Sequence, residues 1–190
     1  ANGLDISLFA SEELGLYSVI EIDWDERGRA WVIETRDYPN ELKPAELGKD
    51  RIRILEDTDG DGKADKAILF ADKLSIPTGM CFARDGLIVQ MAPHFLFLKD
   101  TDGDDKADVR EILFSGWSTG DTHAGPSNLK YGFDNWIWGV MGYAGFNGKV
   151  GEKQHRFGQG VYRFKPDGSE LEYLGRTSNN TWGLGFSENN

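Results

Sequence analysis

Two nine-residue segments concentrate the side chains that could bind a metal ion. Residues 57–65 read DTDGDGKAD and residues 100–108 read DTDGDDKAD, so the two copies differ only at their sixth position. Carboxylates at positions one, three, five and nine repel one another unless a cation joins them, and oxygen-only ligands suit a hard ion of the Ca²⁺ type. The spacing therefore predicts two Ca²⁺ sites, whose ligands would be Asp57, Asp59, Asp61, Asp65, Asp100, Asp102, Asp104 and Asp108.

Both acidic segments begin like the calcium loop of an EF-hand, but position twelve, where that loop has a bidentate glutamate, is Ile68 in the first copy and Glu111 in the second. The flanking residues are typical of strands rather than helices, so we expect both segments at the tips of β-hairpins. The alternative is a solvated acidic turn without an ion. It has more weight for the second copy, because Asp105 replaces the glycine that permits a sharp turn.

A histidine provides the candidate for proton transfer. His123 lies in a loop rich in glycine and polar residues, 115–128, and Asp121 is two residues before it. A neutral imidazole can take a proton from a hydroxyl group, and a nearby carboxylate can orient it. The pattern therefore indicates a catalytic pair of His123 and Asp121, with a structural histidine as the alternative. His94 is a second candidate, and His155, in a polar insertion at 147–159, is expected in solvent.

Two further groups are functional candidates by their position in the chain, and the second of them could bind a planar ligand. Glu34 and Arg36 end a predicted strand, and Asn179, Asn180 and Trp182 lie near the start of a later one. Carboxamides can hydrogen-bond such a ligand, and an indole can stack on it. The alternatives are a surface ion pair for Glu34 and Arg36, and asparagines in turn conformations for the second group.

The composition excludes several classes of protein. The formal net charge is −11, and the two acidic segments hold nine aspartates and two lysines, so most of the negative charge is local. This balance argues against binding to the phosphate backbone of a nucleic acid. One cysteine, Cys81, lies in an apolar run, so we expect it to be buried and predict neither a disulfide framework nor a zinc site. No stretch is apolar enough for a membrane span, and the abundance of Ca²⁺ outside the cytosol favours a periplasmic or secreted location.

The elements that must position these residues are strands of four to eight residues between Gly, Asp, Asn and Pro turns. One short helical stretch is predicted at 40–49. The order of strand, turn, strand, strand, hairpin and strand occurs three times and starts a fourth time at 182–186. The predicted strands are 18–24, 30–35, 51–55 and 67–70, then 78–83, 87–91, 95–98 and 111–114, then 128–133, 136–140, 160–164 and 171–174.

Repeated four-stranded units of about 40 to 50 residues are typical of a β-propeller. We therefore predict an all-β fold of about three and a quarter blades, as one partial propeller domain over residues 1–190. The expected blades are 4–74, 75–116, 117–176 and the start of a fourth at 177–190. Because so few blades cannot close a ring, we expect part of a longer propeller, with an open stack or closure by a second copy as alternatives. A β-sandwich is the alternative fold.

The stretch from His123 to Trp138, HAGPSNLKYGFDNWIW, resembles the H-x-G-x-x-L-x-F-G-x-D-G-x-L-Y motif of the soluble pyrroloquinoline-quinone sugar dehydrogenases, the glucose/sorbosone dehydrogenase family. Val32-Ile33-Glu34 with Arg36, followed by Arg51-Ile52-Arg53-Ile54, is similar to the V-T-E-R…G-R-I-R first blade of that family. The doubled acidic loops, with the FADKL and PTG segments between them, are more similar to the membrane-bound dehydrogenase propellers of planctomycete-type bacteria. The resemblance covers nearly the whole chain.

This resemblance implies a six-bladed ring with a pyrroloquinoline quinone at the mouth of its channel. It implies that His123 accepts the hydroxyl proton of the substrate and that Asn179, Asn180, Trp182 and Arg36 contact the cofactor, although Asn179 stands where the family has an arginine. Relatives in the second branch often carry a c-type cytochrome, which would be the electron acceptor.

The leading hypothesis is therefore the N-terminal half of a calcium-binding propeller that oxidises a sugar or an alcohol. The first alternative is a non-catalytic propeller, stabilised by Ca²⁺, that binds carbohydrate or protein. The second is a propeller hydrolase of the lactonase type, which needs carboxylates in the channel, where Glu34 is the one clear candidate.

Overall fold

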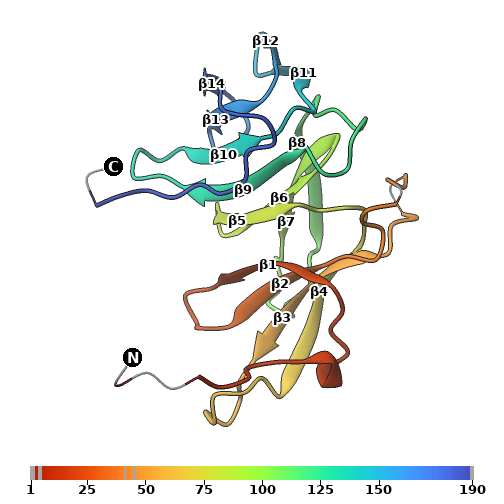
Figure 1. The fold of residues 1–190 in the computed structure, drawn as a ribbon. Helices are drawn as coiled ribbons and strands as arrows, with labels where there is room; N and C mark the ends of the chain where they lie inside the picture. Colours follow the sequence, from red (N-terminus) through yellow and green to blue (C-terminus); the bar gives the residue numbers. More distant parts are fainter. Residues whose placement is uncertain (1–2, 4–5, 41, 45, 189–190) are drawn as a thin grey trace.

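In the computed structural model, which describes residues 3, 6–40, 42–44 and 46–188, three sheets of four antiparallel strands lie side by side. Figure 1 shows them as layers, from blade one in red to yellow to blade three in cyan to blue. The predicted all-β class and the four-stranded antiparallel units are confirmed, and the described residues do not close a ring. None of the described helices is long and apolar enough to cross a membrane.

Blade one contains four strands in chain order, and each strand pairs with the next. A single turn of 3-10 helix, η1 (Glu12–Leu14), precedes them, and Ser11 caps it. Sequential antiparallel pairing follows from the short connections and from the alternation of apolar and polar residues. The strands are β1 (Val19–Trp24), β2 (Ala30–Glu34), β3 (Asp50–Glu56) and β4 (Lys66–Leu74).

Blade two repeats this topology, with β5 innermost and β8 outermost. Its turn between the first two strands is tighter, because Arg84 and Asp85 both adopt positive φ and Gly86 follows directly. The strands are β5 (Gly79–Ala83), β6 (Gly86–Met91), β7 (His94–Lys99) and β8 (Val109–Ser115).

Blade three differs from the prediction by an inserted hairpin. Its four-stranded sheet has the order β14-β13-β10-β9, and the separate hairpin of β11 and β12 projects between β10 and β13. The insertion at 147–159 was predicted as polar, with His155 in solvent. The Nε2 atom of His155 is instead buried, and Phe146, Val150 and Phe157 pack against the main core. The strands are β9 (Pro126–Tyr131), β10 (Ile137–Met141), β11 (Phe146–Val150), β12 (Lys153–Phe157), β13 (Gly160–Phe164) and β14 (Leu171–Gly175).

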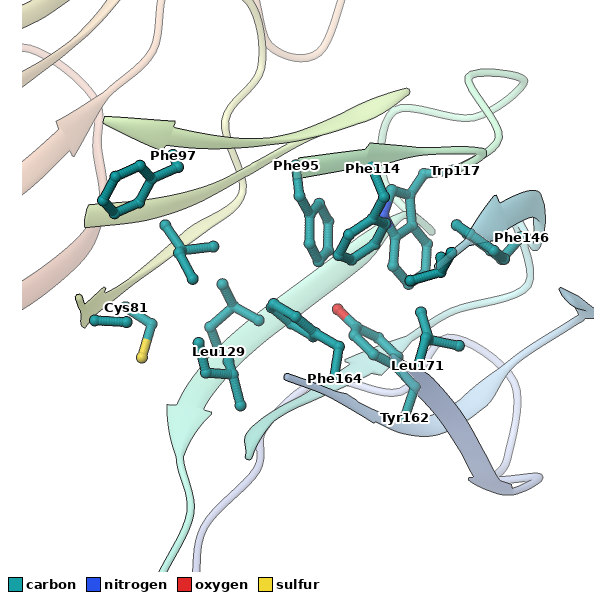
Figure 2. Close-up of a cluster of buried hydrophobic side chains, with 14 of the residues drawn as sticks. Cys81, Phe95, Phe97, Phe114, Trp117, Leu129, Phe146, Tyr162, Phe164 and Leu171 are labelled. Atoms are coloured by element: carbon teal, nitrogen blue, oxygen red, sulfur yellow. The ribbon is translucent and has the colours of Figure 1, made fainter. Parts of the chain in front are cut away.

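The hydrophobic core lies between the blades rather than within any one of them. One cluster joins blade one to blade two, and a larger cluster joins blade two to blade three. Figure 2 shows the second cluster, where Phe95 of β7, Phe114 of β8 and Trp117 lie over Tyr162 and Phe164 of β13. Each such side chain contributes about 1.5–3 kcal/mol when it is fully buried. Each blade is therefore held in place by its neighbours.

Two predicted elements are absent from the described residues. No helix forms in the described part of 40–49, where a turn and irregular backbone lead into β3, and residues 41 and 45 lie outside the description. No strand forms at 182–186, because a strand needs a hydrogen-bonded neighbour and no described segment pairs with these residues. Phe186 instead packs on Phe133 and Trp138 of blade three. The outermost residues of the predicted domain, 1–2, 4–5 and 189–190, are not described.

Candidate functional site

The topology places the two predicted kinds of site at opposite ends of the blades. In an antiparallel meander the turn after the first strand and the turn after the third strand lie at one end, and the other connections lie at the opposite end. The acidic loops join β3 to β4 and β7 to β8, while His123 lies in the connection from β8 to β9. The acidic loops and the histidine therefore lie at opposite ends of the blades.

His123 presents a partly exposed imidazole in a loop that Asp121 holds in shape. The Asp121 Oδ1 atom accepts backbone N–H bonds from His123 at 2.7 Å and from Ala124 at 3.1 Å. The Nδ1 atom of His123 lies 3.2 Å from Thr122 Oγ1 and 3.6 Å from Asp121 Oδ1. The Nε2 atom has no hydrogen-bond partner among the described residues, so this face of the ring can receive a proton from a ligand.

Asp121 is held as a carboxylate by its neighbours. The Tyr143 hydroxyl donates to Asp121 Oδ2 at 2.7 Å, and this bond, together with the backbone N–H groups of His123 and Ala124, holds the pKa of Asp121 below its ordinary value. The same bond raises the pKa of Tyr143. Asp121 therefore positions the loop and one side of the imidazole, as a charged orienting group would.

The connection between β2 and β3 of blade one also contributes to this site. The ring of Tyr38 meets the ring of His123 edge to face, with centroids 5.1 Å apart. The Thr122 hydroxyl donates to the carbonyl oxygen of Pro39 at 3.0 Å. Tyr143, from the connection between β10 and β11, completes the group. The site therefore combines loops of blades one and three, and sequence analysis missed Tyr38 and Tyr143 because their proximity depends on how the blades stack.

The described contacts of the predicted cofactor-binding residues are with other parts of the chain than His123. The guanidinium of Arg36 lies 4.0 Å from the centre of the Tyr17 ring, in a small cavity shared with Leu69, Asp72 and Lys73 of the outermost strand β4. Asn179, Asn180 and Trp182 lie in a turn and the irregular segment that follows β14, and none of their described contacts reaches His123. The assignment of these four residues as quinone contacts stays a prediction.

Glu34 does not offer a free carboxylate to a channel. Its side chain is fully buried and binds the guanidinium groups of Arg53 at 2.6 Å and Arg51 at 2.9 Å. The backbone N–H of Tyr17 also donates to it, at 2.8 Å. The alternative of a surface ion pair between Glu34 and Arg36 is therefore not observed, and the hydrolase alternative loses its one clear carboxylate. Glu34 and the two arginines hold the residues before β1 against β2 and β3, because Arg51 and Arg53 also bind the carbonyl oxygens of Gly15 and Leu14.

The polar residues of the innermost strand were also missed. Glu21 and Asp23 of β1 lie on the same face, and burial raises the pKa of Glu21 although Lys130 of β9 opposes this rise. Cys81 of β5 is buried, as predicted, and burial raises its pKa to about 12, which makes the thiol unreactive. The alternation of strand 18–24 could have revealed these charges, because its polar positions face a neighbouring blade.

Each acidic loop brings three of its predicted ligands together. One carboxylate oxygen from each of Asp57, Asp59 and Asp61 lies within 4.8 Å of the others, and the same holds for Asp100, Asp102 and Asp108. The oxygen-only donor set fits Ca²⁺. The remaining residues act differently: Asp65 accepts the N–H and hydroxyl of Thr58, and Asp104 binds Lys106 at 2.7 Å. Backbone N–H bonds to Asp57 and to Asp100 hold the pKa of each below its ordinary value.

Asp105 adopts the conformation for which glycine was expected. Its φ of 64° corresponds to the 86° of Gly62 in the first loop, so the substitution does not prevent the turn. Its Oδ1 atom instead binds the guanidinium of Arg29, in blade one, at 2.8 Å. Arg29 is only 7% exposed and also binds Asp25 at 2.8 Å. The second acidic loop is thus tied to the neighbouring blade.

A cavity of about 640 Å³ lies beside this ion-pair network, between blades one and two. The turns at 25–29 and 84–86 and the second acidic loop surround it, and Trp31, Phe70 and Phe82 supply its aromatic part. Its size is within the range of small-molecule sites. Acidic residues outnumber arginines in its lining, so it is better suited to an uncharged polar ligand than to an anion.

A protein-family model described as "Domain of unknown function (DUF7133)" matches residues 1–190. No curated protein matches the chain.

Proposed function

Because the chain belongs to the DUF7133 family, whose description assigns no activity, we propose a function from the site itself: part of a calcium-binding propeller oxidoreductase that oxidises a sugar or an alcohol. The location we propose is periplasmic or secreted, where Ca²⁺ is abundant. By the resemblance described above, the electron acceptors would be pyrroloquinoline quinone and then a c-type cytochrome.

The observation that carries this proposal is the arrangement of His123 among Asp121, Tyr143 and Tyr38. An imidazole whose Nδ1 side faces Asp121 and Thr122 leaves Nε2 for the hydroxyl proton of a substrate. Loss of that proton allows the neighbouring C–H bond to release a hydride to a redox cofactor, so that the alcohol becomes a carbonyl. A quinone is the acceptor class for that hydride, and we assign none of its contacts to residues of this chain.

The test of this proposal is the replacement of His123 by asparagine in the protein expressed from its complete gene. We expect sugar- or alcohol-dependent dye reduction in the presence of added quinone to fall by about 100-fold or more, because a general base is lost. The melting temperature should stay within about 1 °C, because the side chain is more than half exposed and its Nε2 atom has no partner.

His94→Asn is the matched control, because the Nδ1 atom of His94 only contacts Ser115 Oγ, at 2.7 Å, on the neighbouring strand. It should leave dye reduction intact. A His123→Asn protein that stays fully active, or that loses its stability instead, would show that His123 is structural. Absence of any dye reduction by the unmodified protein with added quinone would remove the oxidoreductase proposal altogether.

Calcium is proposed as a stabilising ligand of the hairpin tips, because both loops lie at the end of the blades opposite His123. Removal of Ca²⁺ with EGTA should lower the melting temperature, and saturating Ca²⁺ at about 100 times its dissociation constant should stabilise the fold by about 2.7 kcal/mol per site. Asp57→Asn and Asp100→Asn should each remove part of that effect, as calorimetry with and without Ca²⁺ would show. A loss of activity on chelation with no change in melting temperature would contradict a structural role.

The cavity between blades one and two favours a second candidate function, a non-catalytic propeller that binds carbohydrate. Aromatic side chains next to aspartates and arginines match the apolar faces and hydroxyl groups of a sugar. A glycan array distinguishes the two candidates. Binding that Trp31→Ala weakens, without redox activity, favours the binding module, whereas redox activity that His123→Asn abolishes favours the enzyme.

A further inference from the structure

The segment that precedes blade one repeats the segment that joins blade one to blade two. Residues 8–16 read LFASEELGL, and residues 69–76 read LFADKLSI, with one residue fewer in the middle. The second segment contains the C-terminal part of β4, from Leu69 to Leu74, and the start of the connection to β5. The first belongs to no sheet, and only η1 is regular in it. The shared sequence suggests that both segments were built for one structural role.

Both segments make the same backbone hydrogen bond to an acidic loop. The N–H of Ala64, at position eight of the first loop, donates to the carbonyl oxygen of Phe9 at 2.7 Å. The N–H of Ala107, at position eight of the second loop, donates to the carbonyl oxygen of Phe70 at 2.9 Å. Phe9 therefore occupies, next to blade one, the place that Phe70 of β4 occupies next to blade two.

The two segments also pack on equivalent side chains of the following blade. Ala30 and Leu55 face one another across β2 and β3, as Leu87 and Leu98 do across β6 and β7. The cluster before blade one contains Phe9, Ala10, Leu14, Ala30, Val32, Leu55 and Ala64. The cluster before blade two contains Phe70, Ala71, Leu74, Leu87, Val89, Leu98 and Ala107. One by one, in the order given, these residues occupy corresponding places.

The two segments differ in their strand pairing. β4 is paired along its inner edge with β3, for example Ile54 with Ile68. Residues 6–10 pair with no strand in the described part of the chain, and the side chains of Ile6 and Leu8 are 100% and 69% exposed. An unpaired extended edge next to apolar side chains favours the addition of a strand.

The face of β1 beside this segment is also uncovered. Ile20 and Ile22 are 43% and 56% exposed, whereas Met80, which pairs with Val89 as Ile22 pairs with Val32, is 1% exposed because blade one covers it. The alternation of β1 places both isoleucines on one face. The site therefore consists of an unpaired edge at residues 6–10 and an apolar strip on β1.

We propose that residues 6–10 are the outermost strand of a further blade, which packs on the Ile20 and Ile22 face of β1. The occupant is a unit of three antiparallel strands with an apolar face and a free outer edge, and residues 6–10 complete it as its fourth strand. A second copy of residues 1–190 is the less suitable occupant, because each of its described blades already has a fourth strand in β4, β8 or β14.

Hydrogen–deuterium exchange on the protein expressed from its complete gene tests this proposal. We expect the amides of residues 6–10 to exchange at least about tenfold more slowly than those of the exposed loop 57–62, and at rates like those of 67–71 in β4. Exchange of residues 6–10 as fast as that of the loop would overturn the proposal. Slow exchange that disappears on dilution would overturn the choice of occupant, because it would indicate a second copy.

A double substitution, Ile6→Asp with Leu8→Asp, adds a second measurement in the same protein. It should speed exchange at residues 6–10 and lower the melting temperature, because aspartate is unfavourable in a strand and both residues belong to the strand that would complete the added blade. Leu47→Asp is the matched control, since Leu47 is 64% exposed in a connection without this repeat. Equal effects of the double variant and the control would contradict the proposal. If the double variant fails to fold, the exchange rates of the unmodified protein still decide.

Discussion

The two acidic loops are nearly identical in sequence and in conformation, yet they join different parts of the molecule. The loop at 57–65 has Gly62 at its sixth position, a glycine at whose position an added Cβ would meet no atom within 4 Å. The loop at 100–108 has Asp105 at that position, and its carboxylate binds the nearly buried Arg29 of the preceding blade. One loop ends in open space and the other in an interface between blades.

This difference shows that a change at one position can alter the tertiary contacts of a loop while its local conformation stays the same. The Asp, Gly and Thr positions determine the turns, through hydrogen bonds that are the same in both loops. Asp105 adds a contact that only the stacked blades can provide. The second loop is therefore expected to connect cation binding with blade docking, whereas the first loop stabilises only its own hairpin and the segment around Phe9.

The largest effect is expected when the ion-pair network itself is removed. Arg29→Met keeps an apolar stem but leaves Asp25 and Asp105 without their common guanidinium. We expect a loss of about 2–4 kcal/mol in the free energy of unfolding, because one partner of a nearly buried ion pair is gone. Urea denaturation with and without Ca²⁺ measures it.

Arg27→Ala is the control for that prediction. Its guanidinium is 3.9 Å from Asp105 and its side chain is 62% exposed, so its loss should cost less than about 0.5 kcal/mol. Equal costs for the two variants would contradict the claim that the second loop is bound to blade one through Arg29.

A smaller effect is expected when the two loops exchange their sixth residues. Asp105→Gly loses one carboxylate partner of Arg29 but relieves a positive φ, so the net loss should be about 1 kcal/mol. Gly62→Asp places a side chain at a positive φ with no partner, and it should cost about 0.5–1 kcal/mol. Only Asp105→Gly should change the cost of Arg29→Met in a double-mutant cycle. If Gly62→Asp changes that cost as well, the two loops are not independent.

The smallest effect is the response of this network to acid. Burial raises the pKa of Asp25, but the hydrogen bonds from Trp31 and Arg29 outweigh it and hold the pKa below its ordinary value. Such a group adds stability above its unfolded pKa of about 3.9, and that stability is lost as the pH falls through the folded pKa. The cost of Arg29→Met should therefore shrink as the pH falls from 5 toward 2, which denaturation at a series of pH values would reveal. A cost that is the same at every pH would show that Asp25 is not coupled to Arg29.

Much of the fold could be predicted from the sequence, because its signals are local. Alternating apolar residues located the strands, the turn residues located the hairpins, and the doubled acidic segment gave the repeat. The hairpin of β11 and β12 was missed, because its few apolar residues, such as Phe146 and Phe157, pack on a core that other blades supply. The strand at 182–186 was predicted from its pattern but has no neighbour to pair with in the described residues.

The candidate site was predictable only in part, for the same reason. His123 and Asp121 are two residues apart, so their contact could be foreseen. Tyr38 reaches His123 from 85 positions earlier in the chain, and no local pattern marks it. Glu34 and Arg36 are near neighbours in sequence, yet one is buried with two arginines of β3 and the other stacks on Tyr17. Neighbours in sequence are therefore a poor guide to ion pairs at the end of a strand.

The sequence by itself determined an all-β chain of repeated hairpins with two acidic tips and one histidine in a polar loop. Those features depend on backbone preferences and on the spacing of side chains within a few residues. The tertiary structure decided which acidic loop joins two blades, which tyrosines flank His123, and that residues 6–10 pair with no strand among the described residues. These outcomes depend on contacts between residues far apart in the chain, and such contacts exist only once the blades have stacked.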